Sequence, residues 1–555
     1  MSTFDFNSAL QKAVMLQRSG RVAEAAAIYR QLVRGAPPNA QVLFFLGAAE
    51  MQLGNHNEAV RALRRSHELA PDQPRTLCNL GLALINLKRN EEAVTSFDRA
   101  LALDPRYALA HNNRGAALLE LERYEEALAS FESAVAVEPG YAEAHNNRGT
   151  ALRLLARNEE ALASFSRAAA IAPGYAVAHH NRGTALLDLC RWDEALASFD
   201  RALALDRSNA RAHCGRATAL YSLKRLDEAR NDNERALTID PALPEARWNK
   251  ARLALIAGDF ATGLEFYESR WQTPGFSDDR RDYPRPLWDG SQPIAGKTLF
   301  VHDEQGFGDA IQCCRYLPLA REAGAEVILE ARQRLLPLLA SLKGGIRLMA
   351  KGAPPPAFDL YCPIMSLPRA FHTAFETIPA QIPYLFAEAA KREVLRARLG
   401  AKTVPRIGVA WSGSPKPNVD RLRRLPLQLL APLASGPFEF HSLQKENRPD
   451  EVGQLERLPQ LQRHEDEQND FSDAAALIDC MDLVVTVDTV VAHIAGAMGK
   501  PVWILLPFMP DWRWRAEGSD SPWYPTATLF RQKTMGDWSA VIAEVSARLR
   551  AHFGW

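Results

Sequence analysis

Hydrophobic and polar positions in the first half of the chain repeat every 34 residues. The segment that starts at Ala108 aligns without a gap with the segments that start at Ala142 and Ala176. In each unit the apolar positions indicate two amphipathic helices and a glycine lies near the centre of the first helix; a proline follows the second helix, except in the unit from Ala176, where Arg207 takes its place. The small residue lets the second helix approach closely. The pattern predicts about eight helical pairs from Phe6 to about Trp271, with a degenerate last pair.

A different pattern begins after this array. The segment 273–296 is rich in Pro, Gly and charge, which predicts a linker. Short apolar runs then alternate with helical stretches such as 310–324, a β-α-β pattern that predicts two doubly wound lobes of parallel sheet. The expected strands are 297–303, 325–331, 359–364, 406–411, 438–444, 482–488 and 501–507. The predicted fold class is therefore α + α/β, with an array over 1–272, a linker over 273–296 and lobes over 297–400 and 401–555.

The composition and charge of the chain limit which binding partners and which kinds of cysteine site we expect. The formal net charge is zero, so we expect no nucleic-acid partner. No apolar run reaches the roughly 20 residues that span a bilayer. The seven cysteines are scattered without a C-x-x-C pair, which favours reduced thiols over disulfides or a zinc knuckle. With no signal-peptide layout at the N-terminus, we expect a cytoplasmic protein.

Two polar columns run through the array. An asparagine recurs at the same position of successive repeats: Asn79, Asn113, Asn147, Asn181 and Asn249. A glycine at position 215 interrupts the series. Stacked helical repeats form a concave groove, and such a column along it could hold an extended peptide by its backbone, or it could bond only within its own repeats. The histidine column is His111, His145, His179 and His213. Repeats about 10 Å apart are too distant for two of these histidines to share a zinc ion.

Both halves resemble known families. The 34-residue period with its G…Y/W…A…F…A…P pattern resembles the tetratricopeptide (TPR) repeat. VDTVVAHIAGAMGKPVWILLP resembles the donor-binding motif of heptosyltransferase-like glycosyltransferases, and GFGDAIQCCRYLP and GVAWSGSP resemble two further loops of that group. The resemblance implies a GT-B fold. The combined architecture is similar to O-GlcNAc transferases, whose repeats carry a similar asparagine ladder, and to bacterial TPR-containing protein glycosyltransferases, some of which modify flagellin.

The resemblance implies that a nucleotide-sugar donor binds at the ends of strands in the second lobe. Asp488, Thr489 and His493 follow one strand at the start of a helix, whose free N–H groups attract phosphate. Thr489 could donate to a diphosphate oxygen and His493 could donate from its ring if it is protonated or in a suitable tautomer. Asp488 could orient its neighbours, accept sugar hydroxyls or cap the helix. The alternative is a cap and a core histidine without a ligand.

A second group of donor-binding candidates follows two other strands. The loop after Trp411 offers hydroxyl and amide donors, and a basic segment behind it could stabilise the leaving diphosphate without a metal. Among its arginines we favour 421 and 424 over 423, against the alternative of a solvated basic surface. The candidates are Ser412, Gly413, Ser414, Arg421 and Arg424, together with Gln444 and Lys445 at another strand end.

Asp309 in the GFGD loop is the catalytic candidate. Inverting transfer needs a base near the acceptor hydroxyl, and the matching Asp of heptosyltransferases is regarded as that base. The alternative is a helix cap. No D-x-D pair stands where a metal would be held, so we expect neither metal nor cofactor. A late aromatic cluster could stack on the ligand or pack the core: Trp512, Trp514, Trp523 and Tyr524.

These features predict an enzyme that transfers a sugar from a nucleotide-activated donor to a Ser or Thr hydroxyl of a protein held in the groove. Transfer to a lipopolysaccharide or other glycan is one alternative. A TPR scaffold with degenerate transferase lobes is another.

Overall fold

The computed structural model describes residues 6–35, 37–273, 275–276, 280–413 and 422–554. Ser414 and Arg421, both predicted donor ligands, lie outside them. The chain divides into two compact units, Met1–Ala219 and Leu220–Trp555. Secondary structure changes from helices to strands after residue 272, so the second unit contains the last helices as well as both sheets.

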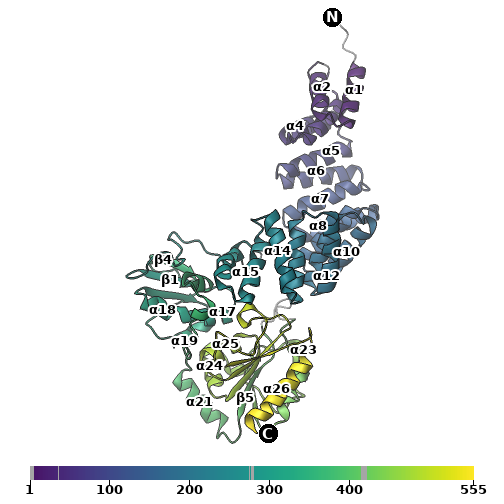
Figure 1. The fold of residues 1–555 in the computed structure, drawn as a ribbon. Coiled ribbons are helices and arrows are strands. Elements are labelled where there is room, and N and C mark those ends of the chain that lie inside the picture. Colours follow the sequence, from purple (N-terminus) through teal and green to yellow (C-terminus); the bar gives the residue numbers. More distant parts are fainter. Residues whose placement is uncertain (1–5, 36, 274, 277–279, 414–421, 555) are drawn as a thin grey trace. The chain divides into compact units, whose positions relative to one another are not determined.

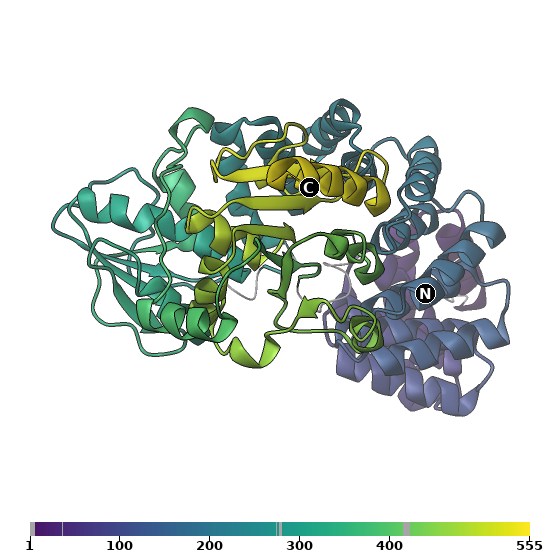
Figure 2. The same cartoon turned by 90° about the horizontal axis from the view of Figure 1, so that it is seen from below.

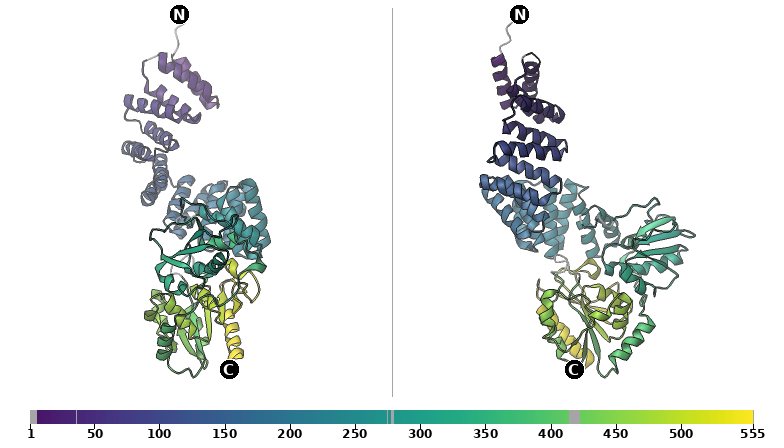
Figure 3. Two further views of the ribbon diagram at one scale, coloured as in Figure 1. Left: turned by 90° about the vertical axis from the view of Figure 1, so that its left-hand side faces the viewer. Right: turned by 180° about the vertical axis from the view of Figure 1, so that it is seen from behind.

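The first part of the chain is an array of helical pairs, which confirms the predicted fold (Figures 1 and 3). In the five pairs from α3–α4 to α11–α12, a glycine in the first helix packs on an aromatic or leucine side chain of the second. A Cβ on Gly115 would lie 2.6 Å from Phe131, and one on Gly149 would lie 2.6 Å from Phe165. The helices are α1 (Phe6–Arg18), α2 (Val22–Gly35), α3 (Ala40–Gln52), α4 (His56–Leu69), α5 (Pro74–Asn86), α6 (Asn90–Leu103), α7 (Ala108–Glu120), α8 (Tyr124–Val137), α9 (Ala142–Leu154), α10 (Asn158–Ile171), α11 (Ala176–Asp188), α12 (Trp192–Leu205), α13 (Ala210–Ser222), α14 (Leu226–Ile239), α15 (Pro244–Ala257) and α16 (Phe260–Tyr267).

The turn inside each pair uses one left-handed residue. Its φ is positive at every repeat, at Gly20, Gly54, Lys88, Glu122, Ala156, Cys190, Lys224 and Gly258. Glycine adopts this conformation without steric cost, whereas the other residues bear a strain. The turn geometry is therefore kept even where the sequence offers no glycine.

Two parallel sheets follow, as predicted. The first has the order β3-β2-β1-β4 and the second β10-β9-β8-β5-β6-β7. The strands are β1 (Thr298–His302), β2 (Glu326–Ala331), β3 (Arg347–Ala350), β4 (Leu360–Pro363), β5 (Arg406–Ala410), β6 (Glu439–Ser442), β7 (Leu461–Gln462), β8 (Leu483–Val487), β9 (Val502–Leu506) and β10 (Ala527–Arg531). Three of them, β3, β7 and β10, were not predicted, and all three are edge strands.

Helices cover the faces of the sheets, and two of them begin at the motif loops. They are η1 (Glu268–Gln272), α17 (Phe307–Cys313), η3 (Cys314–Tyr316), α18 (Leu317–Glu322), η4 (Gln333–Leu335), α19 (Leu336–Leu339), η5 (Ile364–Ser366), α20 (Leu367–Ala370), η6 (Phe375–Thr377), α21 (Ala389–Leu399), η7 (Leu427–Leu430), η8 (Leu433–Ser435), α23 (Pro449–Leu455), η9 (Glu465–Glu467), α24 (Phe471–Asp479), α25 (Val490–Ala497), η10 (Trp512–Trp514) and α26 (Trp538–Phe553). Residues of α26, yellow in Figure 2, share the apolar core of the second sheet with β5, β8 and β9.

The described part of the predicted linker packs on the first sheet. Tyr283 lies 5.4 Å from Phe300 and 5.0 Å from Tyr361 between ring centroids. Trp288 is buried, and its backbone N–H donates to the carbonyl of Tyr361 over 2.8 Å. In the described residues no helix combines the length and apolar character needed to cross a membrane.

Candidate functional site

The strand order of the second sheet marks its binding edge. The chain runs outward from β5 through β6 and β7, then returns to β8 and runs the other way, so the order reverses between β5 and β8. In open α/β sheets, ligands bind at this switch point, beyond the carboxyl ends of the strands. Trp411–Gly413 follow β5 there, and Asp488 and Thr489 follow β8.

Gln444, after β6, joins the same edge. Its Oε1 accepts hydrogen bonds from the backbone N–H groups of Trp411 and Ser412, both over 3.3 Å. The structure thus brings Ser412 and Gln444 together, as the strand-end argument predicted. Lys445 points elsewhere, because its Nζ donates to the carbonyl of Glu465 over 2.6 Å.

Thr489, rather than Asp488, caps helix α25. Its Oγ1 accepts from the N–H of Val491 over 3.2 Å and lies 3.0 Å from the hydroxyl oxygen of Thr486. The capping role considered for Asp488 is therefore filled by its neighbour. Asp488 is buried, burial raises the pKa of its carboxyl, and its nearest cation is Arg423, with Nη1 3.6 Å from Oδ2.

His493 is buried in α25 and neutral. Desolvation lowers its pKa from 6.5 to about 3, so the protonated donor considered from the sequence does not apply near neutral pH. Its Nδ1 lies 2.9 Å from the hydroxyl of Tyr524. Its ring also contacts the GFGD loop, because a Cβ on Gly308 would lie 2.5 Å from His493 Cδ2. The motif loop of the first sheet and that of the second are therefore in direct contact, which only glycine permits at position 308.

Asp309 begins α17 and uses both carboxylate oxygens. Oδ2 accepts from the backbone N–H of Gly306 over 2.7 Å, and Oδ1 accepts from Nη2 of Arg513 over 2.5 Å. The predicted alternative, a helix cap, is thus part of what Asp309 does. Its side chain is 19% exposed, so Asp309 is not sealed from solvent.

The two neighbouring arginines of the basic segment differ in what they contact. Arg424 pairs with Asp450 over 2.6 Å and with Glu451 over 3.1 Å, both on α23. Arg423 lies next to Asp488, with Nη1 3.6 Å from Oδ2, and in the residues that the structure describes its buried Nε has no hydrogen-bond partner. This geometry favours Arg423 as the cation of the site, whereas the sequence argument preferred Arg424.

The late aromatic residues pack in the interior of the protein. All four are buried: Trp512, Trp514, Trp523 and Tyr524. Phe260 of α16 lies 6.0 Å from Trp512 and 6.1 Å from Trp523 between ring centroids. These contacts tie the last helical pair to the loops after β9, so the core interpretation is the one that the structure supports.

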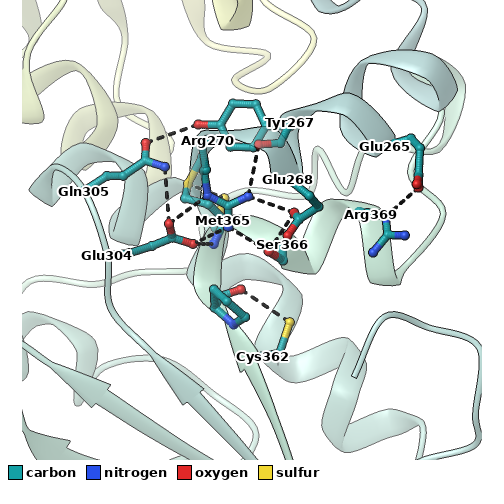
Figure 4. A network of polar contacts seen from close by, with 12 residues as sticks. Glu265, Tyr267, Glu268, Arg270, Glu304, Gln305, Cys362, Met365, Ser366 and Arg369 are labelled. Carbon is teal, nitrogen blue, oxygen red and sulfur yellow. Dashed lines mark hydrogen bonds and ion pairs between the residues drawn. The ribbon is translucent and has the colours of Figure 1, made fainter. Parts of the chain in front are cut away.

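A buried polar network also ties the last helices to the first sheet (Figure 4). Arg270 is fully buried and donates to Glu304 over 2.8 and 3.0 Å, to Glu268 over 2.8 Å and to Ser366 over 2.7 Å. Next to it, the hydroxyl of Tyr267 donates to Gln305 Oε1 over 3.1 Å. Glu304 and Gln305 therefore hold the loop that leads to Asp309.

In the array, three members of the asparagine column, Asn113, Asn147 and Asn181, belong to a hydrogen-bonded chain that passes through the adjacent Asn112 and Asn146. Asn181 donates to Asn146 over 2.9 Å, and Asn147 donates to Asn112 over 3.0 Å, each across a repeat boundary. Asn112 then lies 3.5 Å from Oδ1 of Asn113. Each amide keeps spare capacity, since it has two N–H donors and two lone pairs. Asn79 is half-buried, and Asn249 is buried within the second unit.

The break in that column has a steric reason. A Cβ on Gly215 would lie 2.5 Å from Phe199, so no asparagine fits there. The histidine column is structural: each Nε2 lies 3.0–3.3 Å from a carbonyl oxygen six residues earlier, for His111, His145, His179 and His213. In the residues that the structure describes, no group of three or more His, Cys, Asp or Glu side chains could hold a metal ion.

Comparison with known proteins identifies both segments. The tetratricopeptide repeat profile matches residues 10–74, 78–136, 117–176 and 180–244, and the glycosyltransferase family 9 (heptosyltransferase) profile matches 468–532. The second match contains Asp488, Thr489 and His493. The chain thus combines tetratricopeptide repeats with a family 9 segment, which supports a glycosyltransferase.

Two curated proteins are similar. Protein FlbA of Caulobacter vibrioides is 27% identical over 341 residues, which cover 56% of each chain. Cellulose synthase 2 operon protein C of Komagataeibacter xylinus is 41% identical over 58 residues, 10% of this chain and 4% of that protein. The chain therefore spans only about half the length of the first relative and a small part of the second.

Solved structures resemble the helical part. YrrB, described as a TPR protein with an unusual peptide-binding site, is 24% identical, with a TM-score of 0.30, over 34% of this chain and 96% of its own. PilF of Pseudomonas aeruginosa is 21% identical, with a TM-score of 0.35, over 38% of this chain and 95% of its own.

Proposed function

We propose that this protein transfers a sugar from a nucleotide-activated donor to a Ser or Thr hydroxyl of a protein acceptor, with inversion and without a metal. One observation carries the proposal: the GFGD loop that bears Asp309 packs on the helix of the family 9 segment, at Gly308 and His493. This contact puts a carboxylate next to the edge where a phosphate-bearing ligand would bind.

The donor would lie across the ends of β5 and β8. Its diphosphate would meet the amino end of α25 at Thr489 and the guanidinium of Arg423. Because the contact between Arg423 and Asp488 is long, at 3.6 Å, the guanidinium can turn to a phosphate at small cost. Ser412 and Gln444, at the ends of β5 and β6, would line the nucleotide side of the same edge.

The chemical step is a single displacement. Asp309 takes the proton of the acceptor hydroxyl while the hydroxyl oxygen bonds to the anomeric carbon. The bond from that carbon to the diphosphate oxygen breaks, and the nucleoside diphosphate leaves with the electron pair. Arg423 would stabilise the negative charge that develops on the leaving group, which is the work that a metal does in other transferases. Activity in excess chelator is the expected result.

The tetratricopeptide repeats favour a protein acceptor, since grooves of this kind bind extended or helical peptides. The spare donors and acceptors of the asparagine column would contact the backbone of the acceptor, and flagellin is one candidate. A second function is favoured by the heptosyltransferase description of the family 9 match: transfer to a glycan. Mass spectrometry of acceptors from cells with and without the protein separates the two, because only the first adds sugar mass to a polypeptide.

A binding panel tests the donor site. The whole chain is titrated with UDP, GDP, ADP and CMP and their sugars, and the thermal shift is measured. A ligand at 100 times its dissociation constant stabilises the folded state by about 2.7 kcal/mol. Arg423→Ala should weaken binding of the active nucleotide about tenfold or more, because it removes a charge-assisted bond to phosphate.

Arg424→Ala is the matched control. It neighbours Arg423 and has the same charge, but it faces α23, so it should leave the nucleotide affinity within about twofold of wild type. An equal loss in both variants would contradict the assignment of Arg423. No shift with any nucleotide would contradict the proposed function and favour a scaffold with degenerate lobes.

A further inference from the structure

Arg513 is a buried cation that belongs to none of the sequence motifs described above. It lies in η10, in the loop after β9, with its side chain only 8% exposed. Asp511 holds the backbone of this turn, because its Oδ1 accepts from the N–H of Arg513 over 3.1 Å. The backbone that carries the guanidinium side chain is therefore held in place.

Each nitrogen of that guanidinium has an acceptor. Nη2 donates to Asp309, Nη1 donates to Asp511 Oδ1 over 2.8 Å, and Nε donates to Oε1 of Gln312. Asp309 and Gln312 lie on the same helix, α17, and Asp511 lies in the turn itself. The guanidinium presents donors on three separate nitrogens in a fixed plane, whereas the three donors of a lysine ammonium share one nitrogen and cannot reproduce that spacing.

The same contacts fix the carboxylate of Asp309. Its two oxygens are held by groups that are far apart in the chain, Gly306 for Oδ2 and Arg513 for Oδ1. One bond would leave the carboxylate free to rotate about χ2, while two bonds to opposite oxygens set its plane. A general base must be held in a fixed orientation, because a misplacement of about 1 Å can lower the rate about 10²-fold.

We propose that Arg513 is a positioning residue that sets the orientation of the Asp309 carboxylate across the junction of the two sheets. The inference rests on the proposed function for its catalytic consequence, and on the three acceptors of the guanidinium for its geometry. Arg513 has two carboxylate partners, so one of them, Asp511, can balance its charge while the other reacts.

The test compares R513K with R515K in the whole chain. Arg515 is two residues away, and its guanidinium lies 5.2 Å from the Phe375 ring centroid. With the nucleotide sugar found in the panel, R513K should lower kcat by about 10²-fold and leave the KM for the donor within about twofold. R515K should change neither. D511N, which keeps the Oδ1 acceptor of the turn but removes its negative charge, should lower kcat by a smaller factor.

Two kinetic results would overturn the inference. One is a folded R513K with wild-type kcat. The other is a loss of kcat accompanied by an equal rise in the donor KM, which would place Arg513 on the donor itself. A crystal structure of R513K gives a readout that needs no activity: the Asp309 carboxylate should leave its present plane, and an unchanged Asp309 would contradict the inference. If wild type transfers no sugar, the proposed function fails, and this structure still decides the role of Arg513.

Discussion

The array and the second unit use the same residue types for different purposes. In the array, His111, His145 and their equivalents each lie near a carbonyl six residues earlier, and the contact recurs with the repeat. In the second unit, His493 occurs once, is held neutral by burial, and lies between Tyr524 and Gly308. A histidine contact that recurs with the repeat and ends on the backbone of its own turn belongs to the scaffold. A polar contact that occurs once and joins two motif loops is a candidate for function.

Carboxylate–arginine pairs also differ in purpose between the two regions. Replacing the carboxylate of such a pair in the second unit gives the largest effect that we expect on sugar transfer. Asp309→Asn should lower sugar transfer by about 10²–10⁴-fold with nucleotide affinity unchanged, because the amide cannot accept the proton. Asp98→Asn is the counterpart in the array, where Asp98 pairs with Arg114 over 2.6 Å on the surface. It should leave transfer unchanged. Steady-state rates of both variants with one donor measure the contrast, and full activity of Asp309→Asn would remove that residue from catalysis.

The boundary between the two regions can be tested by truncation. A fragment of residues 220–555 keeps Arg270, Phe260 and Tyr267, whereas 273–555 loses them and leaves Glu304 buried without its cation. Removing one partner of a buried ion pair costs about 3–5 kcal/mol, so the shorter fragment should unfold at much lower urea concentration. Arg270→Ala in the whole chain should show the same loss. Equal midpoints for the two fragments would contradict the role of the last helices.

Buried histidines of the second unit should make its stability depend on pH. Desolvation lowers the pKa of His302 in β1 from 6.5 to about 3, as it does for His493. Below pH 6.5 the unfolded chain binds protons that the folded chain does not, so the unfolding free energy is highest above pH 6.5 and falls towards pH 3. Each group contributes on the order of a few kcal/mol over this range.

The variant His302→Phe isolates this effect. It removes one titrating group from a buried strand position and should reduce the fall in unfolding free energy between pH 7 and pH 4, measured by urea denaturation at several pH values. The acidic groups titrate equally in both proteins, so the difference between the two curves reports His302 alone. Superimposable slopes would show that His302 is not held neutral.

Local patterns predicted the array and most strands. The 34-residue period predicted the helical pairs and the glycine contacts, such as Gly115 with Phe131, because each repeat folds mainly on its neighbours. The strands that the pattern missed, β3, β7 and β10, lie at sheet edges. An edge strand has one hydrogen-bonded neighbour and less burial, so its apolar run is short. β7, for instance, has only two residues.

The parts of the candidate site that follow strands could be predicted from the sequence. The parts formed by pairs of residues far apart in the chain could not. Ser412, Gln444 and Thr489 follow strands, so topology alone brings them to one edge. Arg513 reaches Asp309 across 204 residues, and no local signal marks which of many arginines will do so. The same holds for Arg270 and Glu304, which form a buried pair 34 residues apart, across a segment predicted to be a linker.

The central claim is that the junction of β5 and β8 binds the donor beside Asp309. The most direct test is a crystal structure of the whole chain with the nucleotide sugar that the panel identifies. The account predicts that the diphosphate lies at the amino end of α25, in contact with Thr489 and Arg423, with the anomeric carbon turned towards Asp309. A nucleotide bound elsewhere, or one whose sugar points away from Asp309, would contradict it.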